Sequence, residues 1–468
     1  MKLLKTIIAA TLAAACVLPA QAADKTMSTD IVVLGAGCGG TSASVAAQEL
    51  GAKVILLEKQ GITGGTCKFS EGIMAVESKM QRDWNYGLTK DDAFQRIMRY
   101  GHWRGNGRVV RAFVEKTAST IDWMQGNGVK FEKLFSNYPD GLYTWHIYEG
   151  RGAGWLAKYQ DKFVKNGGTL LLNTPATDLI QGSDGVVRGV IAKNKDGDKI
   201  TINAKAVILA TGGFGANHKM VEKYRPELKG FSTTNHPGAT GDGIILAQQV
   251  GAGLTDIEQI QIHPTVIKKN GALISESMRA RGGFLLNKNG KRFTNELLTR
   301  DVVSANELKQ PGGIAYLVVD DSIYKKNKML RSYVSEGLMK KCDTVADVAK
   351  MIGADPKVVQ ASFDQYWKAY DNKKDDLFGR PEMVIRLDKA PFYVAEVTPG
   401  IHHTMGGVTI DPKAEVLNKQ KKPIPGLFAA GEVTGGVHGG NRIGGNAVAD
   451  IVTFGRISGN SAASYVGK

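Results

Sequence analysis

The chain has 468 residues, 43% of them hydrophobic, and 57 glycines, a composition typical of a globular α/β protein that excludes a disordered or fibrous chain. This length is too great for one ordinary domain and fits two or three. The formal net charge is +15, yet no basic stripe with interleaved aromatic residues occurs, which argues against nucleic acid as a partner. Such a basic surface favours acidic partners or anionic substrates.

The first 22 residues are predicted to be a secretory signal peptide. Lys2 and Lys5 precede an apolar run over 6–18, and an Ala-Gln-Ala cleavage site ends at Ala22. The run is too short to span a bilayer, so no stable membrane insertion is expected. Cleavage removes two lysines and no acid, which leaves a charge of about +13. Export places the mature chain in a bacterial periplasm.

Three cysteines remain after cleavage, Cys38, Cys67 and Cys342. An odd and sparse set of this kind predicts no disulfide framework, even in an oxidising compartment. No C-x-x-C-H sequence occurs, so the chain is not expected to attach a c-type haem. No cysteine and histidine spacing indicates zinc, and no metal site is predicted.

The first glycine cluster lies in a complete strand–helix–strand context. A buried strand over 30–34 runs into a G-x-G-x-x-G sequence at 35–40, a helix follows over 38–50, and a second strand covers 53–57. This context is what a dinucleotide-binding turn requires.

Each member of this cluster has a separate physical role. Gly35 makes the tight turn, Gly37 lets the backbone approach a pyrophosphate at the helix N-terminus, and Gly40 allows the helix to pack on the strand. Glu58 follows the second strand and is placed to bind a ribose 2′-hydroxyl. An acid at this position favours FAD or NAD over NADP.

The next loop distinguishes FAD from NAD. It contains Gly64-Gly65-Thr66 and then Ser70-Glu71-Gly72. Dehydrogenases that use NAD have no fixed glycine pair here, whereas such a loop meets the pyrophosphate and flavin in two-domain FAD proteins. No histidine occurs over 66–76, so the FAD is expected to be non-covalent.

The middle of the chain returns to the same cofactor. A β-meander over 178–210 ends in a strand at 206–209, and Ala-Thr-Gly-Gly follows at 210–213 as a second FAD signature. The sequence G-A-T-G-D-G at 238–243 opens a further helix. Its Asp242 is interpreted either as a contact on the flavin side or as a helix cap.

Residues 258–403 differ in character from the glycine-rich segments on either side. Charged and amphipathic stretches replace the glycine turns, with two helices expected over 341–370. We interpret 258–403 as an inserted capping domain, with the FAD-binding domain in two segments, 28–257 and 404–468.

The capping region begins with charged residues set among apolar runs. Apolar neighbours indicate that these charges are buried, and buried charges need partners. Cations outnumber anions, which leaves room for an anionic ligand, interpreted as a carboxylate substrate; the alternative is a structural ion-pair network. The charged residues are His263, Glu276, Arg279, Arg281, Arg300 and Asp301.

The third glycine cluster opens the last helix. A His-His-Thr-Met-Gly-Gly sequence at 402–407 precedes it, and Glu432 is expected to hold the ribityl chain. The glycines at 439–445 then lead into a helix that ends near 459, and its N-terminus would stabilise negative charge on the flavin pyrimidine. Arg442 in this setting is interpreted as functional.

Together these motifs resemble the flavoprotein subunits of fumarate reductase and succinate dehydrogenase, above all the soluble periplasmic flavocytochrome c fumarate reductases. The resemblance covers nearly all of 28–468. It implies an α/β fold in which a two-segment, Rossmann-like FAD-binding domain carries an inserted α+β capping domain. It also implies an FAD-dependent oxidoreductase that reduces the C=C bond of fumarate.

The resemblance assigns roles to the matching positions. Arg300, in Thr-Arg-Asp, corresponds to the acid that protonates the substrate, and Glu276 and Arg279 correspond to the relay that reprotonates it. The substrate-binding positions are His263, Gln261, Ser275, His402, Arg442 and Gly445. The cofactor-binding positions are Gly35, Gly37, Gly39, Gly40, Glu58, Lys59, Gly64, Gly65, Thr66, Cys67, Gly72, Ala210, Thr211, Gly212, Asp242, His403, Glu432, Ala447 and Val448.

Two departures from the family pattern leave alternatives open. The flavocytochromes carry a multihaem domain that this chain lacks, so a separate c-type cytochrome is the expected electron donor. Ser275 stands where relatives often have threonine, so urocanate, methacrylate or a cinnamate are alternative substrates. A flavin electron carrier without its own substrate and an oxidase like the aspartate oxidases are the alternatives of other classes.

Overall fold

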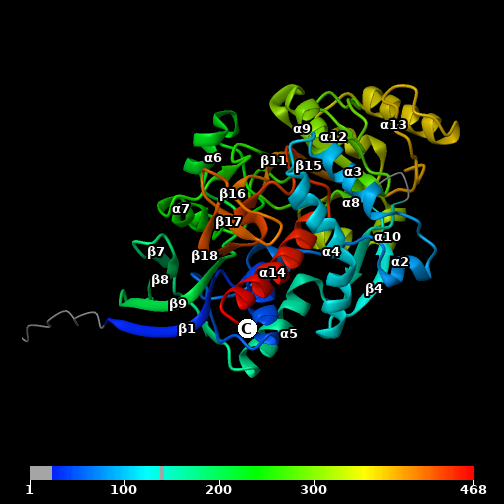
Figure 1. Ribbon diagram of the computed structural model, residues 1–468. Helices are drawn as coiled ribbons and strands as arrows, with labels where there is room; N and C mark the ends of the chain where they lie inside the picture. The colour runs from blue at the N-terminus through cyan, green and yellow to red at the C-terminus, as the bar shows by residue number, and fades with distance from the viewer. Residues whose placement is uncertain (1–23, 137–141) are drawn as a thin grey trace, which may run out of the picture.

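The computed structural model describes residues 24–136 and 142–468 (Figure 1). The predicted signal peptide, residues 1–22, lies outside the described residues. Two sheets organise the chain, one around the N-terminal strand and one within 260–404.

The larger sheet has eight strands around a parallel centre. Strand β1 pairs in parallel with β2 on one side and β9 on the other, and β6 and β18 extend the two sides, also in parallel. The inner half of β1, Ile31 to Leu34, is buried on both faces, as expected for a parallel sheet covered by helices. The eight strands are β1 (Lys25–Leu34), β2 (Val54–Leu57), β6 (Thr169–Leu171), β7 (Ala176–Gln181), β8 (Val187–Lys193), β9 (Lys199–Leu209), β17 (Glu415–Leu417) and β18 (Pro423–Ala429).

Helices α1 (Cys38–Glu49) and α14 (Asn446–Tyr465) pack side by side against this sheet (Figure 1). Small residues allow their close approach: a Cβ on Gly459 would lie 2.3 Å from the carbonyl oxygen of Ala43. The last helix thereby brings the C-terminal end of the chain onto the first dinucleotide-binding helix. It runs six residues beyond the predicted end at 459.

The second sheet has five strands and carries the chain between 260 and 404. Strand β15 is its spine and pairs antiparallel with β11, β13 and β14, while β12 pairs with β13. Helices α12 and α13 lie beside it, at the upper right of Figure 1. The bounds are β11 (Ile260–Val266), β12 (Phe284–Leu286), β13 (Ala315–Asp320), β14 (Lys340–Cys342), β15 (Phe392–Thr404), α12 (Val345–Ile352) and α13 (Pro356–Asp371).

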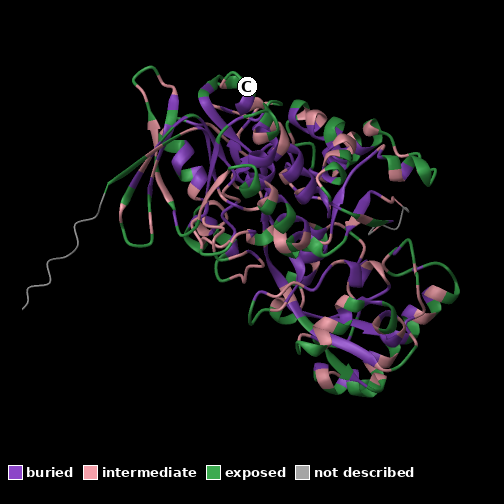
Figure 2. Ribbon diagram, turned by 90° about the horizontal axis from the view of Figure 1, so that it is seen from below, coloured by how far each residue is buried: buried purple, intermediate pink, exposed green. Residues whose placement is uncertain are grey.

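This sheet is buried on both faces, as Figure 2 shows by its purple strands. Alternate residues of β13 enter different cores: Tyr316 and Val318 pack with the aromatic side chain of Phe363, whereas Leu317 packs on the opposite side with Met278. Residues 260–404 therefore have cores of their own, separate from the core around β1.

The other elements connect and cover the two sheets. Two small three-stranded sheets, β10–β16–β19 and β3–β5–β4, lie between the larger elements. The remaining helices are α2 (Lys79–Asp83), α3 (Lys90–Tyr100), α4 (Gly107–Gly126), α5 (Arg151–Lys165), α6 (His218–Tyr224), α7 (Asp242–Gln249), α8 (Ser277–Ala280), α9 (Arg300–Leu308), α10 (Asp321–Lys326) and α11 (Lys328–Ser335). The short strands are β3 (Gly72–Met74), β4 (Phe131–Phe135), β5 (Trp145–Tyr148), β10 (Leu254–Thr255), β16 (Gly407–Thr409) and β19 (Thr434–Gly435). None of the helices in the described residues combines the length and the apolar character needed to cross a bilayer.

The cysteines correct one expectation from the sequence. Cys38 and Cys67 form a disulfide, with their Cα atoms 6.0 Å apart, although an odd and sparse set of cysteines was expected to form no disulfide framework. The two residues are 29 positions apart in the chain but adjacent in space, because the loop after β2 folds back over the N-terminus of α1. Cys342 is a free, buried thiol, consistent with its place in an apolar core.

Candidate active site

A cavity opens where the five parallel strands of the large sheet end, β1, β2, β6, β9 and β18. Such strand ends are where open α/β sheets bind ligands. Fourteen of the predicted cofactor positions line it: Gly35, Gly37, Gly39, Glu58, Lys59, Gly64, Gly65, Thr66, Cys67, Ala210, Thr211, Gly212, Asp242 and Glu432. The first two glycine clusters, distant in sequence, therefore meet at one site together with Glu432, which precedes the third cluster.

The glycines of the cavity fit a dinucleotide cofactor. Gly35 has φ +100°, and a Cβ there would lie 2.5 Å from the carbonyl oxygen of Ala210. A Cβ on Gly40 would lie 1.9 Å from the carbonyl oxygen of Gly35, so α1 can pack this closely on the turn only with glycine. By contrast, a Cβ on Gly37 or Gly65 would meet nothing within 4 Å. These two positions leave backbone exposed to the cavity, as a pyrophosphate at the helix N-terminus requires.

One end of the cavity is polar and fixed by backbone contacts. The Glu58 carboxylate accepts hydrogen bonds from the Ala36 and Gln60 amides, both 2.9 Å long. Beside it, Lys59 forms an ion pair with Asp242, Nζ to Oδ2 2.6 Å. Asp242 thus lies next to Lys59, in the first turn of α7, and its carboxylate makes no helix-capping bond.

Glu432 lies at the other end of the cavity, beside the second sheet. Its carboxylate accepts a hydrogen bond of 2.9 Å from the Thr404 amide and lies 3.4 Å from Nδ1 of His403. Burial opposes ionisation of Glu432, but the neighbouring His403 outweighs it and lowers the pKa of this carboxyl. Glu432 is therefore ionised at neutral pH and can accept a hydrogen bond from a ribityl hydroxyl.

Five predicted cofactor positions do not line the cavity: Gly40, Gly72, His403, Ala447 and Val448. Gly40 and His403 support lining residues, as described above. Sequence reasoning missed several residues that do line it: Cys38, Gln60, Ile62, Thr174, Pro175, Ala176, Gly213, His236, Gly238, Ala239, Leu246, Ala430, Gly431 and Ile451. A signal existed for 174–176, which follow parallel strand β6 after two intervening residues, at the same edge of the sheet where Gly35 and Glu58 follow β1 and β2.

A second polar cluster lies between strand β11 of the second sheet and the start of α14. Gln261 lies at its centre on β11, and its Oε1 accepts a hydrogen bond from Arg300 at 2.7 Å and another from Arg442 at 3.1 Å. The amide nitrogen of Gln261 donates to the carbonyl oxygen of Arg442 at 2.9 Å. The two guanidinium groups, 142 positions apart in the sequence, are thereby held on one buried amide.

A β-bulge turns His402 toward this cluster. Gln261 pairs with His403 and Ile262 with Ile401, so His402 is the extra residue between two paired positions. Its Nδ1 lies 2.7 Å from the hydroxyl of Thr234, and its ring is 5.1 Å from the ring of His263. In a regular strand the side chains of His402 and His403 would simply alternate between the two faces of the sheet. The bulge changes the direction of the His402 side chain.

Both histidines are neutral at physiological pH. Burial lowers the pKa of His263 to about 3, although Glu276 opposes this shift. Burial, and then the charge of Arg300, lower the pKa of His402 well below its usual value. Each imidazole therefore offers one N–H and no positive charge until an anion is bound nearby.

Glu276 connects the cluster to the capping domain. It accepts a hydrogen bond from Arg300, and its other oxygen lies 3.6 Å from Nε2 of His263. Burial opposes its ionisation, but Arg300 outweighs this and holds the pKa of Glu276 well below the usual range. Arg279 is also buried, and this burial lowers the pKa of its guanidinium. The guanidinium groups of Arg279 and Arg300 thus act on one ionised carboxylate, and Arg442 lies next to Arg300 on the Gln261 amide.

The remaining predicted substrate positions lie at the edges of this cluster. Ser275 Oγ accepts a hydrogen bond of 3.3 Å from the Ser277 amide. Gly445 precedes α14 with φ +83°, and a Cβ there would lie 2.4 Å from Nε1 of Trp145. A Cβ on the adjacent Gly444 would lie 2.6 Å from Glu276 Oε1, so the glycine pair allows the capping domain to approach α14.

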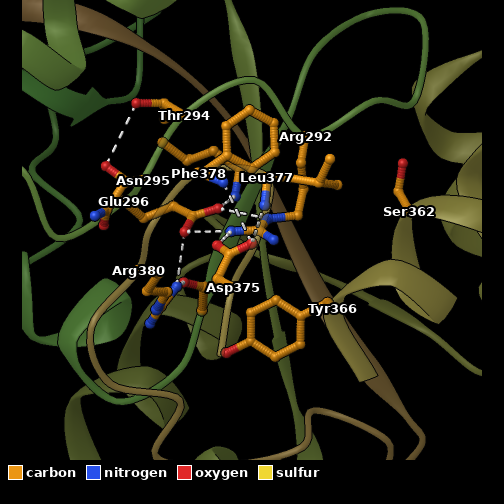
Figure 3. A network of polar contacts seen from close by, with 12 residues as sticks. Arg292, Thr294, Asn295, Glu296, Ser362, Tyr366, Asp375, Leu377, Phe378 and Arg380 are labelled. Atoms are coloured by element: carbon orange, nitrogen blue, oxygen red, sulfur yellow. Dashed lines mark hydrogen bonds and ion pairs between the residues drawn. The ribbon is translucent and has the colours of Figure 1, made fainter. Parts of the chain in front are cut away.

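Figure 3 shows a buried ion network around Glu296, with Arg292, Asp375 and Arg380 as its other charged members. Glu296 accepts hydrogen bonds from Arg292 at 3.2 Å and from Arg380 at 2.9 Å, and Arg292 also pairs with Asp375 at 2.9 Å. The network contacts Arg279 through backbone oxygens. Arg380 donates to the Arg279 carbonyl at 2.7 Å, and Arg279 donates to the Glu296 carbonyl at 2.5 Å. Arg279, a member of the predicted charge cluster, is therefore held in place by a buried ion network that lies next to that cluster.

Comparison with known proteins agrees with this geometry. The model of the family described as "FAD binding domain" matches residues 30–448. The chain is 40% identical over 442 residues to "Fumarate reductase (cytochrome)" of Shewanella frigidimarina, covering 94% of this chain and 77% of that protein. It is also 40% identical to "NADH:fumarate oxidoreductase" of Klebsiella pneumoniae, of which it covers 48%. Among solved structures, the open conformation of a flavocytochrome c3 fumarate reductase superposes with a TM-score of 0.81 at 38% identity, covering 94% of this chain and 79% of that one.

The fold and the cofactor cavity define an FAD-dependent oxidoreductase with a fumarate reductase-like α/β fold. The chain belongs to the FAD-binding family that includes the fumarate reductases. The predictions of fold class, family, enzyme class and cofactor are therefore confirmed.

Proposed function

We propose that this protein reduces the C=C bond of an α,β-unsaturated carboxylate, with fumarate as the substrate and succinate as the product. The observation that carries the proposal is the buried cluster of Gln261, His263, Arg300, His402 and Arg442, which adjoins the cofactor cavity through His403 and Glu432. Together with the neighbouring Arg279 it has three arginines against one ionised carboxylate, Glu276, so a dianion would complete the charge balance.

Two groups of side chains would hold the two carboxylates. Arg300, His402 and Arg442 are the proposed ligands of one carboxylate, and His263 and Ser275 of the other. Neutral imidazoles suit this role because each can donate an N–H, and a bound dianion would raise the pKa of both rings. Cations placed at the carboxylate next to the α-carbon would stabilise the charge that builds there in the transition state.

The chain itself would supply the proton. Bound FAD supplies a hydride from flavin N5 to the β-carbon, and Arg300 is the proposed acid at the α-carbon. An arginine is normally fixed as a cation, but a carbanion is basic enough to take its proton. The hydrogen bond from Arg300 to Glu276, with Arg279 behind it, gives a route by which Arg300 regains that proton. The family resemblance supports the same assignment.

We further propose that residues 258–403 cap the FAD-binding segments 28–257 and 404–468 during turnover, excluding water from the proton transfer. Export to the periplasm and electron supply by a separate c-type cytochrome belong to the same proposal. They are supported by the sequence features of residues 1–22 and by the resemblance to flavocytochromes.

Replacing Arg300 with glutamine tests the mechanism. In anaerobic stopped-flow mixing of reduced, FAD-loaded protein with fumarate, the rate of flavin reoxidation should fall by about 10²–10⁴-fold, the usual contribution of a positioned acid. FAD content should stay unchanged. Arg386→Gln is the matched control, because Arg386 pairs with Asp371 at the surface of the capping domain. Fumarate turnover at the wild-type rate in Arg300→Gln would exclude this acid.

A further inference from the structure

The Cys38–Cys67 disulfide lies in the wall of the FAD cavity. Cys38 is the first residue of α1, at the turn that receives the pyrophosphate, and Cys67 lies in the 3-10 turn Gly65–Phe69 that closes over it. Both cysteines line the cavity together with Gly35 and Glu432. The disulfide therefore stands next to the cofactor rather than on a remote surface of the protein.

Other contacts already hold the two cysteines together. Gly64 donates a backbone hydrogen bond of 3.0 Å to Ala36 and pairs with Gly37 in a short β-bridge. On the far side of the turn, the Gly152 amide donates to the Ser70 carbonyl at 2.8 Å. The turn is thus fixed at both ends without the disulfide. If the bond were broken, the two sulfur atoms would stay close enough to form it again.

The surroundings of the two sulfur atoms suit a reversible reaction. Cys38 is buried at the N-terminus of a helix of 12 residues, where the helix dipole and free amides stabilise a thiolate. Cys67 is partly exposed, and its Sγ lies 3.9 Å from the hydroxyl of Ser70, which also contacts the hydroxyl of Tyr148. One sulfur can therefore leave as a thiolate, while the other has hydroxyl groups beside it that can pass a proton.

The third cysteine provides a contrast. Cys342 is buried in an apolar core of the capping domain, with its Sγ 3.9 Å from the sulfur of Met351. Burial raises the pKa of this thiol, which disfavours the reactive thiolate. Redox chemistry is thus expected at the pair beside the cofactor and not at Cys342.

We infer that Cys38 and Cys67 form a redox-active disulfide that exchanges two electrons with the FAD bound in the same cavity. In the forward direction, reduced FAD gives up two electrons and one proton and becomes oxidised. The S–S bond breaks, one sulfur becomes a thiol, and the other, Cys38, becomes a thiolate. In the reverse direction the dithiol returns two electrons to oxidised FAD and the disulfide forms again.

The consequence is a second store of electrons. A protein loaded with FAD would hold four electrons, two on the flavin and two on the cysteines, so that one charging event could serve two turnovers. This inference depends on the FAD site alone and not on which acid is reduced.

An anaerobic dithionite titration of the FAD-loaded protein tests the inference. Flavin absorbance counts the electrons taken up, and acid denaturation followed by alkylation and peptide mass analysis locates new thiols. We expect four electrons per FAD, and two new thiols at Cys38 and Cys67. Cys67→Ser and Cys38→Ser should each take up two electrons, whereas Cys342→Ser, the matched control, should take up four. The titration is run with excess FAD, so that a variant that binds FAD weakly is still loaded. The electrons taken up by the free FAD are subtracted from the total.

Two results would overturn the inference. The first is uptake of two electrons by the wild-type protein with the disulfide intact after the flavin is fully reduced. The second is formation of the two thiols in FAD-free protein as fast as in FAD-loaded protein, since dithionite would then be reducing the cysteines without the flavin. Thiols that form only when FAD is present support the exchange, and their loss after addition of oxidised FAD would demonstrate the reverse step.

Discussion

Replacing Glu296 with glutamine should destabilise the capping domain more than any comparable surface change. Glu296 is fully buried and accepts hydrogen bonds from two guanidinium groups, those of Arg292 and Arg380. Glutamine keeps the shape but removes the charge, which leaves only Asp375 to balance two buried cations. Removing one partner of a buried ion pair costs about 3–5 kcal/mol, so the free energy of unfolding should fall by that amount.

The effect should also depend on pH in a defined direction. Burial opposes ionisation of Glu296, but Arg292 and then Arg380 outweigh it and lower the pKa of this carboxyl. A carboxyl with a depressed pKa in the folded state stabilises the protein above its unfolded pKa and loses this contribution as pH falls. The difference between wild type and Glu296→Gln should therefore be full at pH 7 and shrink below about pH 4.5.

Urea unfolding of the FAD-loaded proteins, followed by circular dichroism, measures this difference. Glu396→Gln is the matched control, because Glu396 lies on the same sheet but is exposed and only accepts a hydrogen bond from Tyr316. The control should stay within about 0.5 kcal/mol of wild type. Equal free energies of unfolding for the two variants at pH 7 would refute the claim that the ion pairs of Glu296 stabilise the fold.

Two further substitutions test separate parts of the structure. Gly40→Ala should abolish FAD binding in equilibrium dialysis, because its Cβ would lie 1.9 Å from the Gly35 carbonyl oxygen. Gly126→Ala is the control and should bind FAD normally, because its Cβ would meet nothing within 4 Å. Normal FAD binding by Gly40→Ala would contradict the close-packing argument. Burial raises the pKa of Glu71 to about 7, with Glu276 adding to the shift, so stability should decline by up to about 3 kcal/mol between pH 4.5 and pH 7. Glu71→Gln should remove this decline in thermal unfolding at pH 5 and pH 8, and an unchanged decline would assign it to other groups.

The cofactor site could be predicted well from the sequence because its signals are local. Glycine turns that end parallel strands have conformational and packing requirements that the residues themselves show, as at Gly35 and Gly40. The cavity therefore contains residues of the first two predicted clusters and Glu432, which precedes the third. The fold class follows from the same strand–helix–strand pattern.

The substrate cluster depended more on contacts between distant parts of the chain. The sequence shows that His402 and His403 are adjacent, but not that a bulge opposite Gln261 turns the first toward His263. It also does not show that Gln261 joins Arg300 to Arg442. Register and bulges are set by tertiary packing, which a linear pattern does not encode.

The cysteines show the same limit. Their number and spacing gave no reason to pair Cys38 with Cys67, because disulfide formation depends on Cα distance and direction rather than on separation in the chain.

The residues of the predicted charge cluster do not all lie together in the structure. Arg279 and Arg300 line one small cavity with Glu276, whereas Arg281 lies over the ring of Phe135.

The most direct test of the central claim is the reoxidation of the reduced protein by different acids. The mature, FAD-loaded protein would be reduced anaerobically and mixed separately with fumarate, urocanate, methacrylate and cinnamate. We predict rapid flavin reoxidation by fumarate, with succinate formed in equal amount, and slow reoxidation by the other three acids. Rapid reoxidation by another acid, with fumarate inert, would contradict the assignment of fumarate. No reoxidation by any of the four would contradict the proposed reductase activity itself.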